Sequence, residues 1–408
     1  MKQSRLRVSK KSIMLFGAFC MWIAPTYLYN VSFFMFFSNS FVYLAIAAFL
    51  IDFCRNFRRS SIVFCLIVVS VVIQGVATSM LNPGLLVTYV RQYSKTIAFC
   101  YFMDKFTREG GVSKNINVLL HYLEMMIVVN FITLILFPNG MYVSGSYSRN
   151  FWMGYDNTHI RWQIPALAIS YIYSFVVNKR IGFRTVLLSL VILLSTIIVG
   201  SGTAIIAVVV FAAGMLYILL GKRKDQEKGP KLFMPLSALV ISIIGSILIV
   251  GGTIAGSQVG FVAQIAEWLG KDSATLTGRS YIWTSSLATI KEHLIWGVGY
   301  ETSEMTSMRL VNRIGYGLSP HNFCLDVLYN GGIILAIIVI LIYVVLQFKL
   351  SKYKKLPVIS ICGLWLITIS VMGLMEPQYN TQLRLAWIIV GNIAYLCQEN
   401  GLCSIAEK

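Results

Sequence analysis

The residues best suited to chemistry lie in one polar stretch late in the chain, from Thr277 to Gly332. This stretch contains Arg279, a Gly-x-Gly turn at Gly297–Gly299 and a Pro-His-Asn sequence ending at Asn322. A guanidinium binds anions and stays charged, and an imidazole can accept a proton near neutral pH. Gly-x-Gly is a weak signal here, because no strand precedes it and no phosphate loop follows. We predict that this stretch is the active-site segment.

A helix opening is predicted to position the histidine. Ser319 can cap a helix and Pro320 suits its first position, which places His321 and Asn322 in the first turn. Free backbone N–H groups and the positive dipole end at such a terminus favour a nearby anion. The same field favours neutral imidazole over imidazolium, so His321 is expected to be able to accept a proton.

A second helix is predicted to position the arginine. Thr277 is a suitable N-cap for a helix over about residues 280–294, which places Arg279 at its first turn. An apolar face recurs at helical spacing and is formed by Trp283, Leu287, Ile290 and Leu294. A shorter amphipathic helix is predicted over Phe261–Leu269. Both helices are expected to lie on the outer membrane surface.

The composition indicates a membrane protein. The chain has 408 residues, of which 57% are hydrophobic and 12% charged, and its mean hydropathy is +0.73. Soluble domains carry about twice this charged fraction. Apolar runs long enough to cross a bilayer recur along the whole length. We therefore predict an all-α, polytopic membrane helical bundle that forms a single integral membrane domain over residues 1–408.

About twelve spanning helices are predicted, with one large external loop over residues 253–320 between the ninth and the tenth. The net charge of +18 suggests nucleic acid for a soluble protein, but this topology places most Lys and Arg residues on the cytoplasmic side. No nucleic-acid partner is therefore expected. The protein is predicted to lie in the cytoplasmic membrane with both termini inside. The predicted spans lie near residues 13–30, 38–53, 61–80, 85–103, 117–137, 162–178, 185–200, 203–220, 232–252, 321–346, 356–375 and 382–398.

Charged residues within or beside the spans are further candidates. Arg91 and Lys95 are four residues apart and share one face of a helix. Charge at this depth indicates a water-filled, anion-accepting cavity, and the alternative is snorkelling of Arg91 with a distant acid paired to Lys95. Glu376 and Arg384, at the outer ends of the last two spans, are predicted to form an ion pair.

An aromatic-rich external loop, Pro138–Gln163, precedes the sixth span. Aromatic rings with interspersed polar groups suit sugar rings, and they equally suit an interfacial aromatic belt. Asn157 and Arg161 are the candidate substrate-binding residues of this loop. No Cys/His spacing resembles a metal site. Asp-x-Asp is absent from the sequence, so no metal or cofactor is expected.

The ordered motifs resemble a known superfamily of membrane proteins. Thr277-Gly278-Arg279, then Trp283, then His293-x-x-x-Gly297-x-Gly299, then His321-Asn322 is similar to the O-antigen ligase and polysaccharide polymerase superfamily. A fainter match lies at Gly154-Tyr155-Asp156-Asn157. The resemblance implies an integral membrane glycosyltransferase with Arg279 and His321 as catalytic residues. A second family arginine is expected where this chain has Gly202, and Arg161 or Arg91 could supply that charge.

The resemblance also implies substrates and partners. Family members move a glycan from a polyprenyl diphosphate to a hydroxyl, so Arg279 would bind the donor phosphates and His321 would act as base. Asn322, Arg161, Arg91, Lys95 and Asn157 are the predicted substrate-binding residues. The expected partners are a polyprenyl-diphosphate-linked oligosaccharide, membrane lipid, and a flippase and chain-length regulator of the same pathway.

The sequence and the resemblance are compatible with three functions. The compact external loop favours a repeat-unit polymerase. The alternatives are an O-antigen ligase that transfers glycan to lipid A core, and a flippase or other transporter with Arg91 and Lys95 along its pathway.

Overall fold

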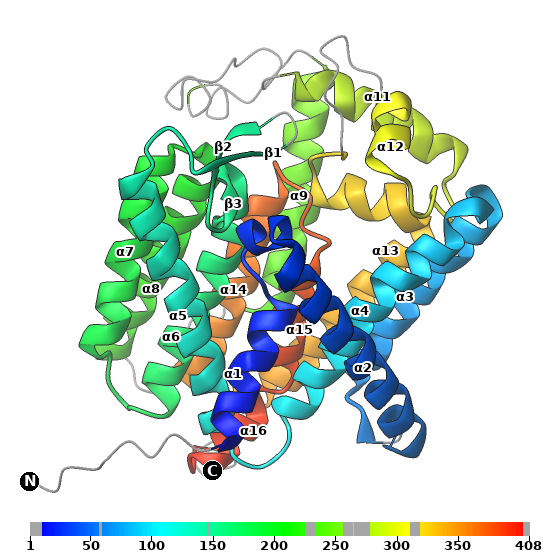
Figure 1. The fold of residues 1–408 in the computed structure, drawn as a ribbon. Coiled ribbons are helices and arrows are strands. Elements are labelled where there is room, and N and C mark those ends of the chain that lie inside the picture. Colours follow the sequence, from blue (N-terminus) through cyan, green and yellow to red (C-terminus); the bar gives the residue numbers. More distant parts are fainter. Residues whose placement is uncertain are drawn as a thin grey trace, which may run out of the picture. The chain divides into compact units, whose positions relative to one another are not determined.

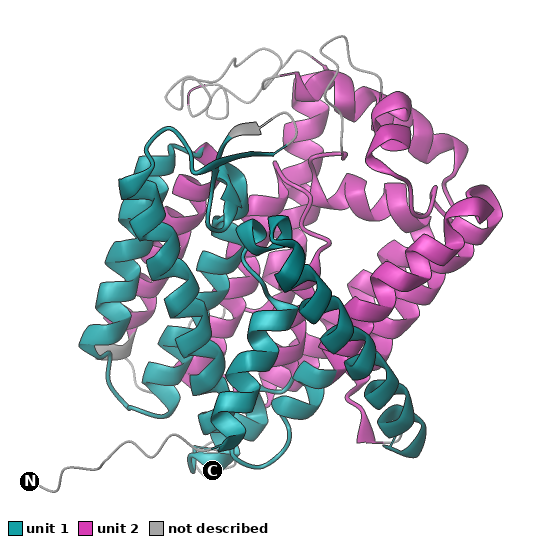
Figure 2. Ribbon diagram, in the orientation of Figure 1, with its two compact units in different colours: residues 1–58, 102–201, 392–408 teal, residues 59–101, 202–391 magenta. Residues whose placement is uncertain are grey.

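A computed structural model describes residues 10–56, 59–144, 147–224, 233–255, 264, 278–310 and 319–402. These residues form two compact units, coloured separately in Figure 2. Unit 1 contains residues 1–58, 102–201 and 392–408, and unit 2 contains residues 59–101 and 202–391. The predicted amphipathic helix Phe261–Leu269 lies outside the described ranges.

Both units are built mainly from helices, labelled in Figure 1. Those of unit 1 are α1 (Lys10–Trp22), η1 (Thr26–Asn30), α2 (Ser32–Asn56), α5 (Val112–Leu136), η4 (Asp156–Thr158), α6 (Ile160–Val176), α7 (Phe183–Val199) and α16 (Ile393–Glu399). Those of unit 2 are α3 (Ile62–Leu81), η3 (Pro83–Leu85), α8 (Gly202–Lys224), α9 (Pro235–Ile254), α11 (Arg279–Glu292), α12 (Ser303–Arg309), α13 (Phe323–Ser351), α14 (Pro357–Gly373) and α15 (Thr381–Gly391). Helix α4 (Leu86–Phe106) belongs to unit 2 as far as Tyr101.

Six of the described helices are long and apolar enough to cross a bilayer: α2, α3, α5, α8, α9 and α13. Helices α7 and α14 are apolar but shorter. The predicted class, a polytopic helical membrane protein, is therefore confirmed. Helical segments occupy all twelve predicted positions, although the last is divided at Asn392 into α15 and α16. The count of twelve spans and the external loop stay predictions.

A small antiparallel sheet in unit 1 was not predicted. Its strands are β1 (Tyr142–Ser144), β2 (Tyr147–Phe151) and β3 (Gly154–Tyr155), in the order β1-β2-β3. The buried residues Asn130 and His159 attach this sheet to α5 and α6. The carboxamide oxygen of Asn130 accepts a hydrogen bond from the backbone N–H of Met153 at 2.8 Å, and the His159 Nε2 atom lies 2.9 Å from the carbonyl oxygen of Gly154.

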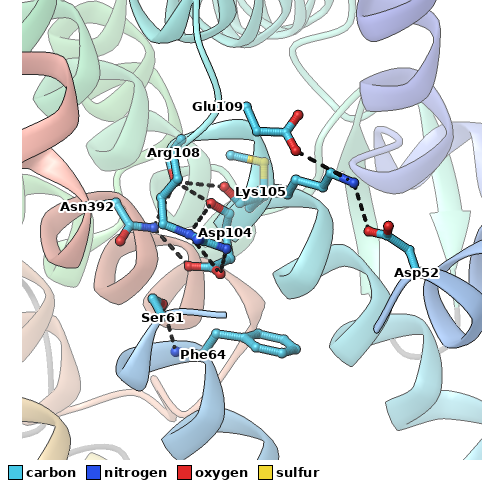
Figure 3. A network of polar contacts seen from close by, with 10 residues as sticks. Asp52, Ser61, Phe64, Asp104, Lys105, Arg108, Glu109 and Asn392 are labelled. Atoms are coloured by element: carbon cyan, nitrogen blue, oxygen red, sulfur yellow. Dashed lines mark hydrogen bonds and ion pairs between the residues drawn. The ribbon is translucent and has the colours of Figure 1, made fainter. Parts of the chain in front are cut away.

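A polar cluster joins separate segments of unit 1 (Figure 3). The fully buried carboxylate of Asp104 accepts from Arg108 at 2.7 Å and from the Asn392 carboxamide at 2.9 Å. Lys105 forms an ion pair of 2.7 Å with Asp52 and a longer one of 3.6 Å with Glu109. Each charged member is thus matched by an opposite charge, which is typical of a structural network.

Helix α11 packs on α9 and α13 within unit 2. Its buried side consists of Ile282, Trp283, Ser286, Thr289 and Ile290. The predicted apolar face is therefore only partly right, because Leu287 and Leu294 are 42% and 45% exposed. The two hydroxyl side chains on the buried face are small and donate to backbone carbonyls of the preceding turn, which lets the helix approach its neighbours closely.

A kink in α13 explains the Gly-x-Gly motif. Gly332 has φ 61° and ψ −160°, which interrupts the helix. The motif lies against this interruption: the backbone N–H groups of Val298 and Gly299 donate to the carbonyls of Tyr329 and Asn330 at 2.7 and 3.2 Å. A Cβ atom at Gly297 would lie 2.5 Å from the Tyr329 carbonyl oxygen. The motif is therefore a close backbone contact that compensates for the kink.

Candidate active site

Arg279 is the first residue of α11, as predicted. The N-cap is Gly278, whose φ of 82° lies in the left-handed region that glycine adopts readily. Thr277, the predicted cap, lies outside the described residues. This turn places the guanidinium at the start of a helix whose buried face, centred on Trp283, is fixed in the core of unit 2.

His321 lies one residue before the N-cap of α13, so the prediction that His321 and Asn322 occupy its first turn is wrong. The helix begins at Phe323, because the Asn322 carboxamide oxygen accepts from the N–H groups of Cys324 and Leu325 at 3.0 and 3.2 Å. Asparagine and serine are comparable N-caps, and here the cap position is occupied by Asn322 instead of Ser319. His321 itself has φ 48°, a left-handed conformation that few non-glycine residues adopt.

Asn322 fixes the backbone beside His321, and its predicted role in substrate binding stays a prediction. Its carboxamide nitrogen donates to Ser246 Oγ on α9 and to the Leu374 carbonyl, both at 3.0 Å. Its oxygen makes the two cap bonds, and the residue is fully buried. Both amide protons and both acceptor sites are thus used by the protein. These bonds fix the backbone that carries His321.

Glu376 brings the two predicted catalytic residues together. Its Oε1 atom accepts a hydrogen bond from Arg279 Nη2 at 3.0 Å, and its Oε2 atom lies 3.7 Å from His321 Nδ1. The Glu376 side chain is 7% exposed, whereas Arg279 and His321 are 20% and 28% exposed. One buried carboxylate therefore lies between an accessible guanidinium and an accessible imidazole.

The predicted ion pair between Glu376 and Arg384 is wrong. Arg384 instead packs against aromatic rings, with its guanidinium carbon 4.4 Å from the centroid of Tyr379 and 5.8 Å from that of Tyr93. The sequence predicts the carboxylate at the end of a span but does not predict which of several arginines it contacts. Only the packing of α11 and α13 in the same unit decides that Arg279 is the partner.

The cluster has the groups that acyl- and glycosyl-type transfers use. The 3.7 Å between His321 Nδ1 and Glu376 Oε2 is too long for a hydrogen bond, so the carboxylate lies beside the ring without a direct bond to it. An imidazolium formed at this position is attracted by the Glu376 carboxylate. The Glu376 carboxylate, rather than the first turn of a helix, lies beside the imidazole.

Arg91 and Lys95 lie on α4 in unit 2. Arg91 is exposed and Lys95 is half-buried. No ion pair joins Arg91 to any residue that the structure describes. The residues beside them on the same helix, Val90 and Ser94, line a groove between α3 and α4. Their roles in substrate binding stay predictions.

Asn157 and Arg161 belong to unit 1 and are described there alone. Asn157 donates to the Tyr155 hydroxyl at 3.2 Å and accepts from Ser201 Oγ at 2.5 Å. Arg161, in the first turn of α6, is partly exposed. The substrate-binding roles of Asn157 and Arg161 stay predictions.

Two comparisons with known proteins support the resemblance stated from the motifs. Residues 185–340 match a family model described as "O-Antigen ligase". The chain is also 31% identical over 189 residues to an O-antigen ligase of Pseudomonas aeruginosa. That match covers 45% of this chain and only 39% of the relative. No solved structure matches the chain.

Proposed function

We propose that this protein is a multi-pass membrane glycosyltransferase of the ligase type, which moves a glycan from a polyprenyl diphosphate to an acceptor hydroxyl. The observation that carries the proposal is the Glu376 carboxylate between Arg279 and His321. This arrangement places a proton acceptor, His321, and an anion-binding group, Arg279, next to the same carboxylate. The family match over residues 185–340 includes both catalytic candidates.

In the proposed reaction, Nε2 of His321 takes the proton of the acceptor hydroxyl. The hydroxyl oxygen forms a bond to the anomeric carbon, and the bond from that carbon to the diphosphate oxygen breaks. The electron pair leaves with the diphosphate, which needs no proton because it is already a stable anion. Glu376 stabilises the imidazolium, as a carboxylate does in other histidine-based catalytic groups.

Arg279 is assigned to the leaving diphosphate. Only Nη2 of its guanidinium is bound to Glu376, and a guanidinium has five N–H donors in a planar fork. The remaining donors can therefore bind phosphate oxygens while the carboxylate fixes the orientation of the fork. This charge would stabilise the negative charge that builds up on the diphosphate in the transition state.

The ligase assignment replaces the polymerase predicted from the compact external loop. Both the family model and the Pseudomonas aeruginosa relative carry the name O-antigen ligase. We therefore assign lipid A core, rather than a second lipid-linked repeat unit, as the acceptor class. A flippase and a chain-length regulator of the same pathway are the proposed protein partners.

Purified protein supplied with a synthetic lipid-linked repeat unit tests the assignment. Transfer that requires added lipid A core supports a ligase. A ladder of products without that acceptor would instead identify a polymerase. Movement of intact lipid across vesicles without any new glycosidic bond would identify a flippase and overturn the proposal.

A further inference from the structure

Arg384 is a buried cation on α15. The residue is 3% exposed, and its Nε and Nη2 atoms are buried without a hydrogen-bond partner. No carboxylate in the described parts of the chain forms an ion pair with it. An arginine cannot lose its proton in a protein, and an uncompensated buried ion is strongly destabilising. This guanidinium therefore needs an anion from outside the described chain.

Aromatic rings hold Arg384 in this position. Its guanidinium lies over Tyr379 and Tyr93, and the Tyr379 hydroxyl donates to Ser70 Oγ at 2.7 Å. The rings attract the cation, and the Tyr379 side chain also forms a hydrogen bond with it, but Nε and Nη2 have no partner among the described residues. The arrangement therefore orients the guanidinium and leaves part of its donor capacity unused.

Tyr93 also lines an apolar groove between α3 and α4. The groove has a volume of about 380 Å³. No acidic side chain lines it, and its wall is formed by Val71, Val72, Gly75, Val76, Ser79, Leu86, Tyr89, Val90, Tyr93, Ser94 and Ile97. The wall of this apolar groove thus includes the Tyr93 ring, which lies 5.8 Å from the buried guanidinium of Arg384. An apolar groove next to a cation suits a lipid chain that carries an anionic head.

We propose that this groove binds the isoprenoid chain of a polyprenyl diphosphate, with Arg384 as the counter-ion of its phosphates. The identity of the lipid rests on the proposed function, because a polyprenyl diphosphate is the donor there. Arg279 already shares a carboxylate with His321, so Arg384 is the less compensated of the two cations. Since Arg384 is 3% exposed, the Tyr93 ring must move aside when the phosphates bind.

A binding experiment without any sugar tests this inference separately from catalysis. The full chain is purified in nanodiscs of zwitterionic phosphatidylcholine, and binding of a photoreactive polyprenyl diphosphate is measured by crosslinking and peptide mapping. Val72→Trp fills the groove from α3, where Val72 is 56% exposed. Val69→Trp is the matched control, because Val69 is 43% exposed on the same helix and does not line the groove.

Crosslinks are expected on α3 and α4, and Val72→Trp should weaken binding about tenfold or more while Val69→Trp leaves it unchanged. Arg384→Gln should weaken binding by a similar factor, and Arg384→Lys should restore part of it because the charge remains. Equal binding by Val72→Trp, Arg384→Gln and wild type would overturn the inference. Equal competition by phosphatidylglycerol would also overturn it, because the groove would then be a general anionic-lipid site.

The same measurements separate the two proposals. If wild type binds the sugar-free lipid in the groove but transfers no glycan, the proposed function fails and the lipid site remains. If wild type transfers glycan and the Val72→Trp and Arg384→Gln variants do so at the same rate and donor concentration, only the lipid site fails.

Discussion

The Oε2 atom of Glu376 lies 3.7 Å from Nδ1 of His321, while the other oxygen of the same carboxylate binds Arg279 at 3.0 Å. A single side chain is therefore hydrogen-bonded to one proposed catalytic group and lies close to the other. Because Glu376 is almost fully buried, its charge acts on His321 with little screening by solvent. Its removal should affect the imidazole and the guanidinium together.

Glu376→Gln is expected to lower the rate of glycan transfer about 100-fold, because the imidazolium loses its stabilising charge. Glutamine keeps the size of the side chain, so the fold should be retained. The rate is measured as glycosylated acceptor formed per minute at saturating donor. Glu304→Gln is the control, since Glu304 is an exposed carboxylate on α12. A rate for Glu376→Gln within twofold of that control would remove Glu376 from the site.

His321→Ala and Arg279→Ala are each expected to abolish transfer while the protein still inserts in the membrane. Arg279→Lys should recover little activity, because an ammonium lacks the planar fork that binds phosphate and carboxylate together. Product analysis by gel and membrane fractionation measures both properties. His121→Ala and Lys291→Ala, at exposed positions, should behave like wild type. Normal product formation by either site variant would assign the chemistry to other residues.

The helices could be predicted from the sequence because their cause is local and repeated. Apolar runs of spanning length give the helical segments their positions, and the structure places a helical segment at each of them. The kink at Gly332 was missed, because hydropathy carries no information about a single φ of 61°. The small sheet was missed because its strands are very short and are held by distant residues such as Asn130.

The site was predicted in part, because some of its residues are positioned by local signals and others by contacts between distant segments. Arg279 lies at a helix start that local signals in the sequence identify. The start of α13 was predicted three residues too early, at Pro320 instead of Phe323, because both Ser319-Pro320 and Asn322 can open a helix. Glu376 was assigned to the wrong arginine. Which cation a carboxylate meets depends on how helices far apart in the sequence pack, and no spacing in the chain reports that.

Asn322→Ala should destabilise the protein by about 2–4 kcal/mol, because it removes a helix cap and two buried cross-links to α9 and Leu374. Asn322→Asp should be at least as destabilising, because it keeps the cap acceptor but buries a carboxylate against the Leu374 carbonyl oxygen. Thermal unfolding in detergent measures the change. Asn178→Ala, at an exposed position, is the control. If Asn322→Ala unfolds like wild type but binds donor weakly, Asn322 acts in substrate binding, as the sequence predicts, and not in stability.

Gly332→Ala is expected to destabilise unit 2 by about 2 kcal/mol or more, because alanine is strained at φ 61° and its Cβ would meet the Ile295 backbone. Gly251→Ala on α9 is the control, since no atom lies within 4 Å of a Cβ built there. Alanine in that helix should be neutral or slightly stabilising. Unfolding temperatures of the two variants are compared in the same detergent. Equal temperatures would show that the kink is not required for the fold.

His159 should make unit 1 sensitive to acid. Burial lowers the pKa of His159 to about 4, from an ordinary value of 6.5. The residue lies before α6, outside the predicted spans. Its neutral ring accepts from the Asn130 carboxamide at Nδ1, at 3.4 Å, while Nε2–H donates to the Gly154 carbonyl. Protonation would place a second donor opposite that carboxamide, with no acceptor for it.

The sign of the effect follows from the lowered pKa. Above pH 6.5 the ring is neutral in both the folded and the unfolded chain, so the full stability is present. As the pH falls from 6.5 to 4, the unfolded chain binds a proton that the folded chain does not, and stability is lost by about 3 kcal/mol. His159→Gln cannot titrate, so the difference between its unfolding free energy and that of wild type should change by this amount over the same pH range. Parallel pH profiles for the two proteins would show that His159 titrates normally in the folded chain.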